Sequence, residues 1–279
     1  VVVDNDSPDD SAERLRAAFS RNEHTEVTII ANDENRGFSA ANNQGAAEAS
    51  GEVLFFLNPD TIVHDTAIRD LYEFITQSAD TGAVGPLVLN ADGSLQNSVS
   101  SRVSPASLIA HHLPIDTVLP NDQSDDHPTE TAAVDVVKGC ALAVRREVFN
   151  AVGGWDASYF MYAEERELCY AIQEAGYTNY YFPKASITHY GAASSDANYA
   201  EQQVIHHQSV VQFLERHHSP TVRAVHRITG AIGFGVRSIV FALLSSLTQD
   251  TGHNYERRGR AAKKLFKWFV WDYAGRGDD

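Results

Sequence analysis

Short runs of β-branched and aromatic residues alternate with amphipathic stretches along residues 1–190. Apolar runs followed by polar loops are typical of buried strands in α/β proteins. The pattern predicts strands at 1–3, 27–31, 53–57, 83–89, 134–137, 141–144 and 180–182. It predicts helices at about 12–22, after residue 37, and at 65–77, 164–175 and 200–218, with a loop at about 114–133. This alternation is typical of a doubly wound parallel sheet.

Three polar clusters follow the first three predicted strands: Asp4-Asn5-Asp6, Asn35-Arg36-Gly37 and Asn58-Pro59-Asp60. Ligands of such sheets bind beyond the carboxyl ends of the strands, so three consecutive clusters predict a single site. Asp and Asn can hydrogen-bond a nucleobase or ribose. Glycine at the mouth of a helix lets the backbone approach a phosphate, although an ordinary capped helix has the same pattern. Asp60 offers a hard oxygen ligand for Mg²⁺ or Mn²⁺.

Three glutamates, Glu164, Glu165 and Glu167, crowd the start of one predicted helix. The simpler interpretation is a favourable interaction with the helix dipole. The catalytic interpretation makes one carboxylate a general base, partly desolvated by the apolar segment 159–162 that precedes the helix. His189 follows a predicted strand. We interpret the paired histidines as structural; they are His111-His112, His206-His207 and His217-His218.

The character of the chain changes after Pro220. Segment 231–247 is apolar apart from Arg237 and is short for a bilayer span. The last predicted helix, 260–273, combines an apolar stripe with lysine, arginine and tryptophan, a composition typical of helices at membrane interfaces. A terminal helix that packs in the core is the alternative. We therefore predict two parts, residues 1–218 and a helical region at 219–279.

Charge is spread unevenly along the chain. Residues 257–279 contain seven Lys and Arg against three Asp and Glu, a charge of +4. The whole chain has a net charge of −15, so residues 1–256 have a net charge of −19. An acidic body argues against general nucleic-acid binding. A surface poor in Lys and rich in Asp suggests adaptation to high salt. The two cysteines, Cys140 and Cys169, make no disulfide framework and indicate a reducing, cytoplasmic compartment.

An ordered set of motifs extends from residue 1 to about 215: VVVDNDSPDDS, NRGFSAANNQG, FFLNPDT, DGSLQNS, VKGCALAVRREVFNAVGGWDASYFMYAEERELCYAIQEAGY and THYGAAS. Together they resemble the family 2 glycosyltransferases, specifically the rhamnosyltransferase-like branch. The resemblance implies a GT-A fold, a Rossmann-like mixed sheet with helices on both faces, followed here by C-terminal helices. It also implies an inverting transfer of a sugar from a nucleotide-diphosphate donor to a glycan or lipid-linked acceptor hydroxyl.

The resemblance also assigns residues. It implies Glu165 as the base, with Glu164 beside it, and Asp60 and His189 as ligands of Mg²⁺ or Mn²⁺. The implied nucleotide-sugar contacts are Asp4, Asn5, Asn35, Arg36, Gly37, Asn42, Asn58, Asp60 and Gly139. The family usually has Asp where this chain has Glu165, and an acid where it has Asn58.

The family usually begins about 35 residues earlier, and a sheet without that first strand exposes an apolar edge. Two alternatives to an active glycosyltransferase stay open: a non-catalytic protein that keeps the fold, with or without nucleotide binding, and a nucleotidyltransferase. The latter lacks support, since no Gly-rich, Lys-containing phosphate loop follows the first strand. The expected location is the cytoplasm, peripherally on the inner face of the membrane.

Overall fold

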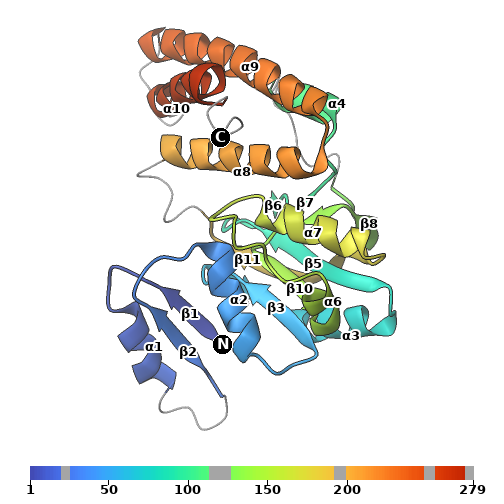
Figure 1. Cartoon of the computed structure of the whole chain (residues 1–279). Coiled ribbons are helices and arrows are strands. Elements are labelled where there is room, and N and C mark those ends of the chain that lie inside the picture. The colour runs from blue at the N-terminus through green and yellow to red at the C-terminus, as the bar shows by residue number, and fades with distance from the viewer. Residues whose placement is uncertain (20–25, 113–126, 192–198, 248–254, 274–279) are drawn as a thin grey trace. The chain divides into compact units, whose positions relative to one another are not determined.

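The computed structural model describes residues 1–19, 26–112, 127–191, 199–247 and 255–273. The chain forms two compact units, each assembled from two stretches of sequence (Figure 1). Unit 1 consists of Val1–Ser101 and Asp126–Gly191, and unit 2 of Arg102–Asp125 and Ala192–Asp279. Helix 200–218, placed by the sequence in the first part, therefore belongs with the C-terminal helices.

Unit 1 is built on a seven-stranded sheet. Its central path runs β3 (Val53–Leu57), β10 (Ala141–Arg145), β5 (Thr81–Leu89), β11 (Thr178–His189) and β4 (Thr61–Val63). Two short strands extend it: β6 (Leu95–Gln96) pairs with β5, and β8 (Ala132–Val134) pairs with β11. Two separate pairs complete the unit, β1 (Val2–Asn5) with β2 (Ile29–Asn32), and β7 (Val99–Ser100) with β9 (Val136–Val137).

The mixed sheet implied by the resemblance is confirmed, whereas the alternation of strands and helices alone had indicated a parallel sheet. β10 runs antiparallel to both of its neighbours, β3 and β5. Parallel pairing joins β1 to β2 and β11 to β5. Strand direction could not be read from the sequence, because a buried run looks the same in either direction. The strand predicted at 134–137 is divided between β8 and β9, and the one predicted at 180–182 is the middle of the longer β11.

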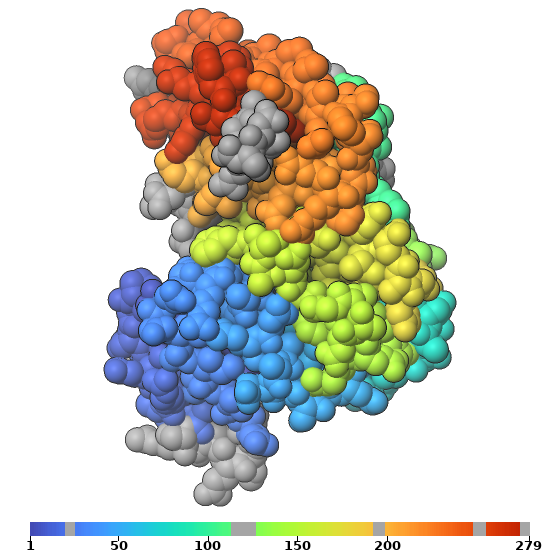
Figure 2. All heavy atoms as spheres, in the orientation of Figure 1, coloured from blue at the N-terminus to red at the C-terminus, as the bar shows by residue number. Residues whose placement is uncertain are grey.

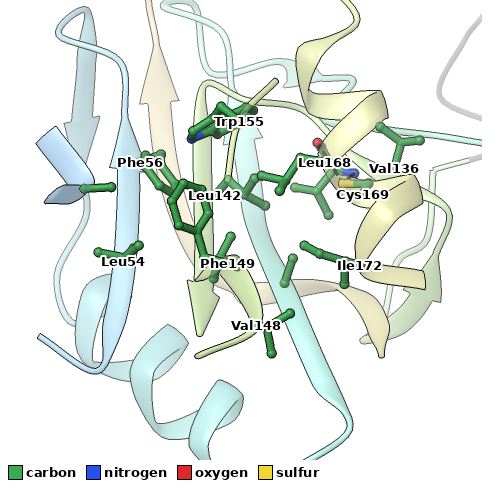
Figure 3. Close-up of a cluster of buried hydrophobic side chains, with 14 residues drawn as sticks. Leu54, Phe56, Val136, Leu142, Val148, Phe149, Trp155, Leu168, Cys169 and Ile172 are labelled. Carbon is green, nitrogen blue, oxygen red and sulfur yellow. Dashed lines mark hydrogen bonds between the residues drawn. The ribbon is translucent and has the colours of Figure 1, made fainter. Parts of the chain in front are cut away.

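Helices cover both faces of the sheet, as predicted. Side chains alternate along β10: Leu142 and Val144 lie in one apolar cluster with residues of β3, α6 (Arg146–Ala151) and α7 (Glu164–Glu174). Figure 3 shows this cluster around Trp155, Phe56 and Leu168. Ala143, between those two, lies in the opposite cluster with α3 (Ala67–Gln77). This two-residue period places the same strand in both cores.

Two further helices accompany the β1–β2 pair. They are α1 (Ser11–Phe19) and α2 (Phe38–Glu48), whose small side chains pack beside β1. The predicted helix at 12–22 runs past residue 19 into 20–25, which lie outside the described residues, as does most of the predicted loop at 114–133.

Unit 2 is helical. It contains α4 (Pro105–His112), α8 (Tyr199–His217), α9 (Pro220–Leu247), α10 (Tyr255–Lys267) and the π-helical turn η2 (Trp268–Asp272). Leu265, Trp268 and Phe269 pack on Val211 of α8 in its core. The apolar stripe predicted to lie at a membrane is therefore largely buried, and the core-packing alternative describes the last helix.

A series of exposed apolar side chains lies instead along α9. By length and composition alone this helix could cross a membrane, a test that core helices of soluble proteins also pass.

Candidate active site

The ends of β1 and β2 are joined through one side chain, Asn5. Its Nδ2 donates to Asn35 Oδ1 at 3.0 Å and to the Gly37 carbonyl at 3.2 Å. Its Oδ1 accepts from Asn32 Nδ2 at 2.9 Å and from the Arg36 backbone N–H at 3.1 Å. All four partners lie on β2 or in the loop before α2, so the first two predicted polar clusters form one surface.

Asp4 and Arg36 take different positions at this surface. Asp4 is buried, and its Oδ1 accepts the Ser7 backbone N–H at 3.0 Å, which shapes the loop after β1. The Arg36 guanidinium lies 3.7 Å from Asp33 Oδ1 and 3.6 Å from Glu34 Oε1, against carboxylates of its own loop. In this structure, Arg36 therefore contributes its backbone to the Asn5 network.

Gly37 packs directly on the segment that precedes α7. Its φ is +80°, and a Cβ there would lie 2.6 Å from the Phe160 carbonyl oxygen. The same oxygen accepts the Phe38 backbone N–H at 2.8 Å. Figure 2 shows the yellow-green segment before α7 against the blue surface of the N-terminal region. Gly37 was predicted to let the backbone approach a phosphate. In the structure, the absence of a side chain lets this backbone approach that of Phe160.

A second connection between α2 and this segment runs through Asn43. Its Nδ2 donates to the Trp155 carbonyl at 2.7 Å, and its Oδ1 accepts the Trp155 N–H at 3.0 Å. The neighbouring Asn42, one of the implied nucleotide contacts, bonds to the Phe38 carbonyl of its own helix at 2.9 Å. Sequence reasoning missed Asn43, since only the fold reveals a partner that is distant in sequence.

Asp60 and His189 meet where β4 pairs with the end of β11. Thr61 is paired with His189 across the two strands, and the Tyr190 N–H donates to the Asp60 carbonyl at 2.9 Å. Asp60 Oδ1 lies 3.3 Å from His189 Nε2. Asn58 lies beside them, with its Nδ2 at 3.4 Å from the same nitrogen. The structure thus brings together the two metal ligands implied by the resemblance.

Gln96 accepts a hydrogen bond from the Nδ1 atom of His189 and orients its ring. Its Nε2 donates to Asn90 Oδ1 at 2.7 Å and to the His189 carbonyl at 3.3 Å, so its Oε1 is an acceptor. That oxygen lies 2.7 Å from His189 Nδ1, which must carry the proton. This bond leaves Nε2, the nitrogen that faces the Asp60 carboxylate, as the ring atom through which His189 can bind a divalent cation. Sequence reasoning did not single out Gln96.

The acidic helix begins after two residues with left-handed backbone. Tyr162 has φ +70° and Ala163 has φ +64°, conformations that cost non-glycine residues on the order of 1–3 kcal/mol each and concentrate at functional sites. They place Glu164 and Glu165 at the first two positions of α7. Glu167 lies one turn further, and its Oε2 accepts the Tyr159 hydroxyl at 2.9 Å. This bond gives Glu167 a role in fixing the preceding loop.

The two leading glutamates have raised pKa values. Burial, followed by the charge of Glu165, raises the pKa of Glu164 to about 8, and Glu164 Oε2 is buried without a hydrogen-bond partner. Desolvation also raises the pKa of Glu165, although its side chain is partly exposed and Arg166 and Lys138 act in the opposite direction. Because cations favour charge on Glu165, we expect Glu165 to ionise first and Glu164 to keep its proton at neutral pH.

Residues 138–140 connect the acidic helix to the metal-ligand pair. A Cβ on Gly139 would lie 3.6 Å from Glu165 Cβ, so the backbone there passes close to Glu165. The next residue, Cys140, accepts the Asn58 backbone N–H at 2.9 Å. Glu165, Asn58 and the Asp60–His189 pair therefore lie around one short segment before β10. The third polar cluster and the acidic helix belong to one region.

Known proteins resemble this chain in sequence and in fold. Residues 1–153 match the model of the family described as glycosyl transferase family 2. The chain is 30% identical over 258 residues to N-acetylglucosaminyl-diphospho-decaprenol L-rhamnosyltransferase of Mycobacterium tuberculosis, covering 85% of this chain and 81% of that protein. It is 31% identical over 174 residues to the low-salt glycan biosynthesis hexosyltransferase Agl10 of Haloferax volcanii, covering 61% of this chain and 52% of that protein.

Among solved structures, the mannosyltransferase PcManGT of Pyrobaculum calidifontis, in complex with GDP-Man and Mn²⁺, superposes with a TM-score of 0.56 at 16% identity. The match covers 97% of this chain and 77% of that one. At this identity the likeness shows the fold alone, which is the GT-A fold.

Substituting Gly37 tests the close packing on Phe160. Gly37→Ala should lower the free energy of unfolding in urea by more than Gly93→Ala. Both glycines have positive φ, +80° and +84°, so both variants suffer backbone strain of about 1–2 kcal/mol. Only Gly37 has a neighbour within 3 Å of the added Cβ, because Gly93 has nothing within 4 Å. Equal losses of unfolding free energy in the two variants would show that the loop at Gly37 accommodates the added Cβ without an energetic cost.

Proposed function

Because the chain belongs to glycosyl transferase family 2, as a rhamnosyltransferase-like enzyme with the GT-A fold, we propose that it transfers its sugar with inversion, using Glu165 as base and a divalent metal at Asp60 and His189. The chain is a nucleotide-sugar glycosyltransferase that acts on a glycan or lipid-linked acceptor. The observation that carries the proposal is the approach of His189 Nε2 to within 3.3 Å of the Asp60 carboxylate oxygen. This pair favours the enzyme over the non-catalytic alternative.

The metal proposal depends on the donor set. One carboxylate and one imidazole leave several positions for donor phosphates and water, which suits Mn²⁺ or Mg²⁺. When bound, such an ion offsets the negative charge that develops on the departing diphosphate. Asp60 and His189 would hold it, and Gln96 would keep the imidazole in the binding tautomer. Asn58 would contribute a neutral amide where the family usually has an acid.

The base proposal depends on the state of the two glutamates. Glu165, as carboxylate, would take the proton of the acceptor hydroxyl while that oxygen bonds to the anomeric carbon. The bond from this carbon to the diphosphate oxygen breaks on the opposite face, so the nucleoside diphosphate leaves with the bonding electrons. Desolvation raises the basicity of Glu165, which helps the transfer of the proton. Glu164, still protonated, adds no second charge beside it.

The nucleotide would lie over the Asn5 network, where backbone and amide groups of β1 and β2 form a polar edge. We propose contacts from Asp4, Asn5 and the loop at 35–37. The start of α2 supplies backbone N–H groups for an anion. Gly139, beside Glu165, would lie near the sugar.

We further propose that the enzyme works at the cytoplasmic face of a membrane and binds it through α9. Six large apolar side chains recur every three or four residues along this helix, on one face. They are 39–79% exposed: Ile228, Ile232, Val236, Ile239, Leu243 and Leu247. The opposite face packs within unit 2. The M. tuberculosis relative is named for a decaprenol-linked substrate. A membrane-bound acceptor would explain why these six apolar side chains, the α9 stripe, are exposed.

Asp60→Asn should abolish the dependence of nucleotide binding on Mn²⁺. Isothermal titration of nucleoside diphosphates, with Mn²⁺ and with EDTA, measures the effect, and the two affinities should become equal in the variant. Asp80→Asn, an exposed position on the turn before β5, is the matched control and should keep the Mn²⁺ effect. If Asp60→Asn retains the stimulation by Mn²⁺, the metal is held elsewhere.

Glu165→Gln should reduce sugar transfer by about 10²–10⁴-fold, because the amide cannot accept the proton. Donor binding, measured by titration, should persist. Glu174→Gln, the same substitution at the exposed end of α7, should leave transfer unchanged. In the wild type, transfer should decline as the pH falls through the raised pKa of Glu165. Normal turnover by Glu165→Gln would assign the base to another group.

Charge introduced into the α9 stripe should weaken membrane binding. Flotation with anionic lipid vesicles should recover wild-type protein, and Ile232→Glu combined with Ile239→Glu should remain largely unbound because each carboxylate would have to enter the interface. Ile68→Glu, at an exposed isoleucine of α3, is the control and should float as the wild type does. Undiminished flotation of the double variant would rule out the stripe as the membrane contact.

A further inference from the structure

Three buried histidines from three helices meet in the core of unit 2. His112 ends α4, His207 lies in the middle of α8, and His226 lies in the second turn of α9. Their exposed fractions are 1%, 3% and 1%. One ring nitrogen of each lies within 4.8 Å of one ring nitrogen of each of the other two. The sequence pattern had suggested only structural roles for His112 and His207.

The hydrogen bonds of Thr229 fix the tautomer of His112. The Thr229 hydroxyl donates to the Val225 carbonyl at 2.7 Å, one turn back in α9. Its single proton is then used, so the hydroxyl oxygen accepts from His112 Nδ1 at 2.8 Å. His112 Nε2 is left as a lone pair, and it is buried without a hydrogen-bond partner.

Tyr273 has the same effect on His226. Its hydroxyl donates to the Arg223 carbonyl at 3.0 Å and lies 3.2 Å from His226 Nδ1. The oxygen therefore accepts from Nδ1–H, and Nε2 of His226 is a lone pair. His207 Nδ1 is also buried without a partner. Unpaired polar atoms in a protein core each cost on the order of 1–3 kcal/mol, so the unpaired nitrogens of His112 and His207 require an explanation.

The surroundings keep all three rings neutral. Burial lowers the pKa of His112 and of His226 to about 3, and that of His207 well below its usual value. The positive charge of Arg237 also lowers the pKa of His112. Its guanidinium donates to the carbonyls of His111 and His112 at 3.2 and 3.0 Å. The neutral imidazole is the form that binds metals.

Two glycines of α9 allow this convergence. A Cβ on Gly233 would lie 1.9 Å from the His112 carbonyl oxygen, and one on Gly230 would lie 2.4 Å from the Phe269 ring. Helix α4 and the aromatic turn η2 can therefore approach the α9 backbone directly. The ring centroids of His112 and His226 are 4.9 Å apart as a result, and those of His207 lie 5.7–5.8 Å from both.

We propose that His112, His207 and His226 bind a Zn²⁺ ion that joins α4, α8 and α9. Zinc bonds imidazole nitrogen at about 2.0–2.1 Å, which places tetrahedral ligand atoms roughly 3.3 Å apart, so small side-chain rotations inward would complete the site. Three imidazoles suit zinc, whereas Mg²⁺ and Mn²⁺ prefer oxygen ligands. Thr229 and Tyr273 would act as orienting partners behind the ligands. This site is separate in residues and in chemistry from the Asp60–His189 pair.

Metal content of the full chain tests the proposal. The protein should carry Asp60→Ala and His189→Ala, so that the other pair adds no zinc. After EDTA treatment, incubation with Zn²⁺ and dialysis into metal-free buffer, mass spectrometry of the metal should find about one Zn²⁺ per chain. Co²⁺ in its place should give the visible absorption of a tetrahedral site. Zn²⁺ should also raise the melting temperature.

Variants distinguish zinc bound by the three histidines from zinc bound at the protein surface. On the same background, His207→Phe should lose the bound zinc and its thermal effect, whereas His217→Phe, at the end of the same helix, should keep both. Thr229→Val should bind zinc about 10–100-fold more weakly because His112 loses its orienting partner. Thr221→Val, exposed on the same helix, should bind it normally.

Two results would overturn the proposal. One is a folded background protein that retains no zinc, which would leave the histidines as an aromatic cluster packed without metal. The other is retention of zinc by a folded His207→Phe variant, as judged by circular dichroism. The first result needs no cluster variant, so the proposal can be refuted even if His207→Phe does not fold.

Discussion

The contact between Gly37 and Phe160 holds the two halves of the proposed donor site in register. On one side is the start of α2, with the Asn5 network over which we propose that the nucleotide lies. On the other is the loop whose left-handed residues, Tyr162 and Ala163, direct the leading glutamates of α7. Because the backbones touch without an intervening side chain, a shift of either half would carry to the other. In the proposed mechanism, the position of Glu165 is therefore tied to the position of the nucleotide.

Much of this arrangement could be predicted from the sequence. Strands ending in polar residues were located by apolar runs, and the resemblance assigned Asp60, His189 and Glu165 before their geometry was known. Strand direction could not be predicted, because the antiparallel β10 has the same composition as a parallel strand. Gln96 and Asn43 were missed for a related reason: each acts through a partner far away in sequence, His189 and Trp155.

The helical unit was harder to interpret. The amphipathic pattern of the last helix was read correctly, but its apolar face contacts protein. Periodicity identifies a face that must be covered and does not identify what covers it. The histidine pairs illustrate the same limit, since only the meeting of α4, α8 and α9 distinguishes His112 and His207 from their neighbours. Adaptation to high salt, suggested by the acidic composition, stays a prediction.

The assembly of unit 2 from two separated stretches of chain constrains when it can fold. Helix α4 leaves the ribosome before the second stretch of unit 1 is synthesised, and the helix against which it packs, α9, begins more than 100 residues later. Contacts so distant in sequence form slowly, and domains generally fold in order of synthesis. Until α9 is synthesised, the side of α4 that packs on it has no native cover. The order of synthesis therefore delays the completion of the helical unit until α9 and the helices that follow it have been made.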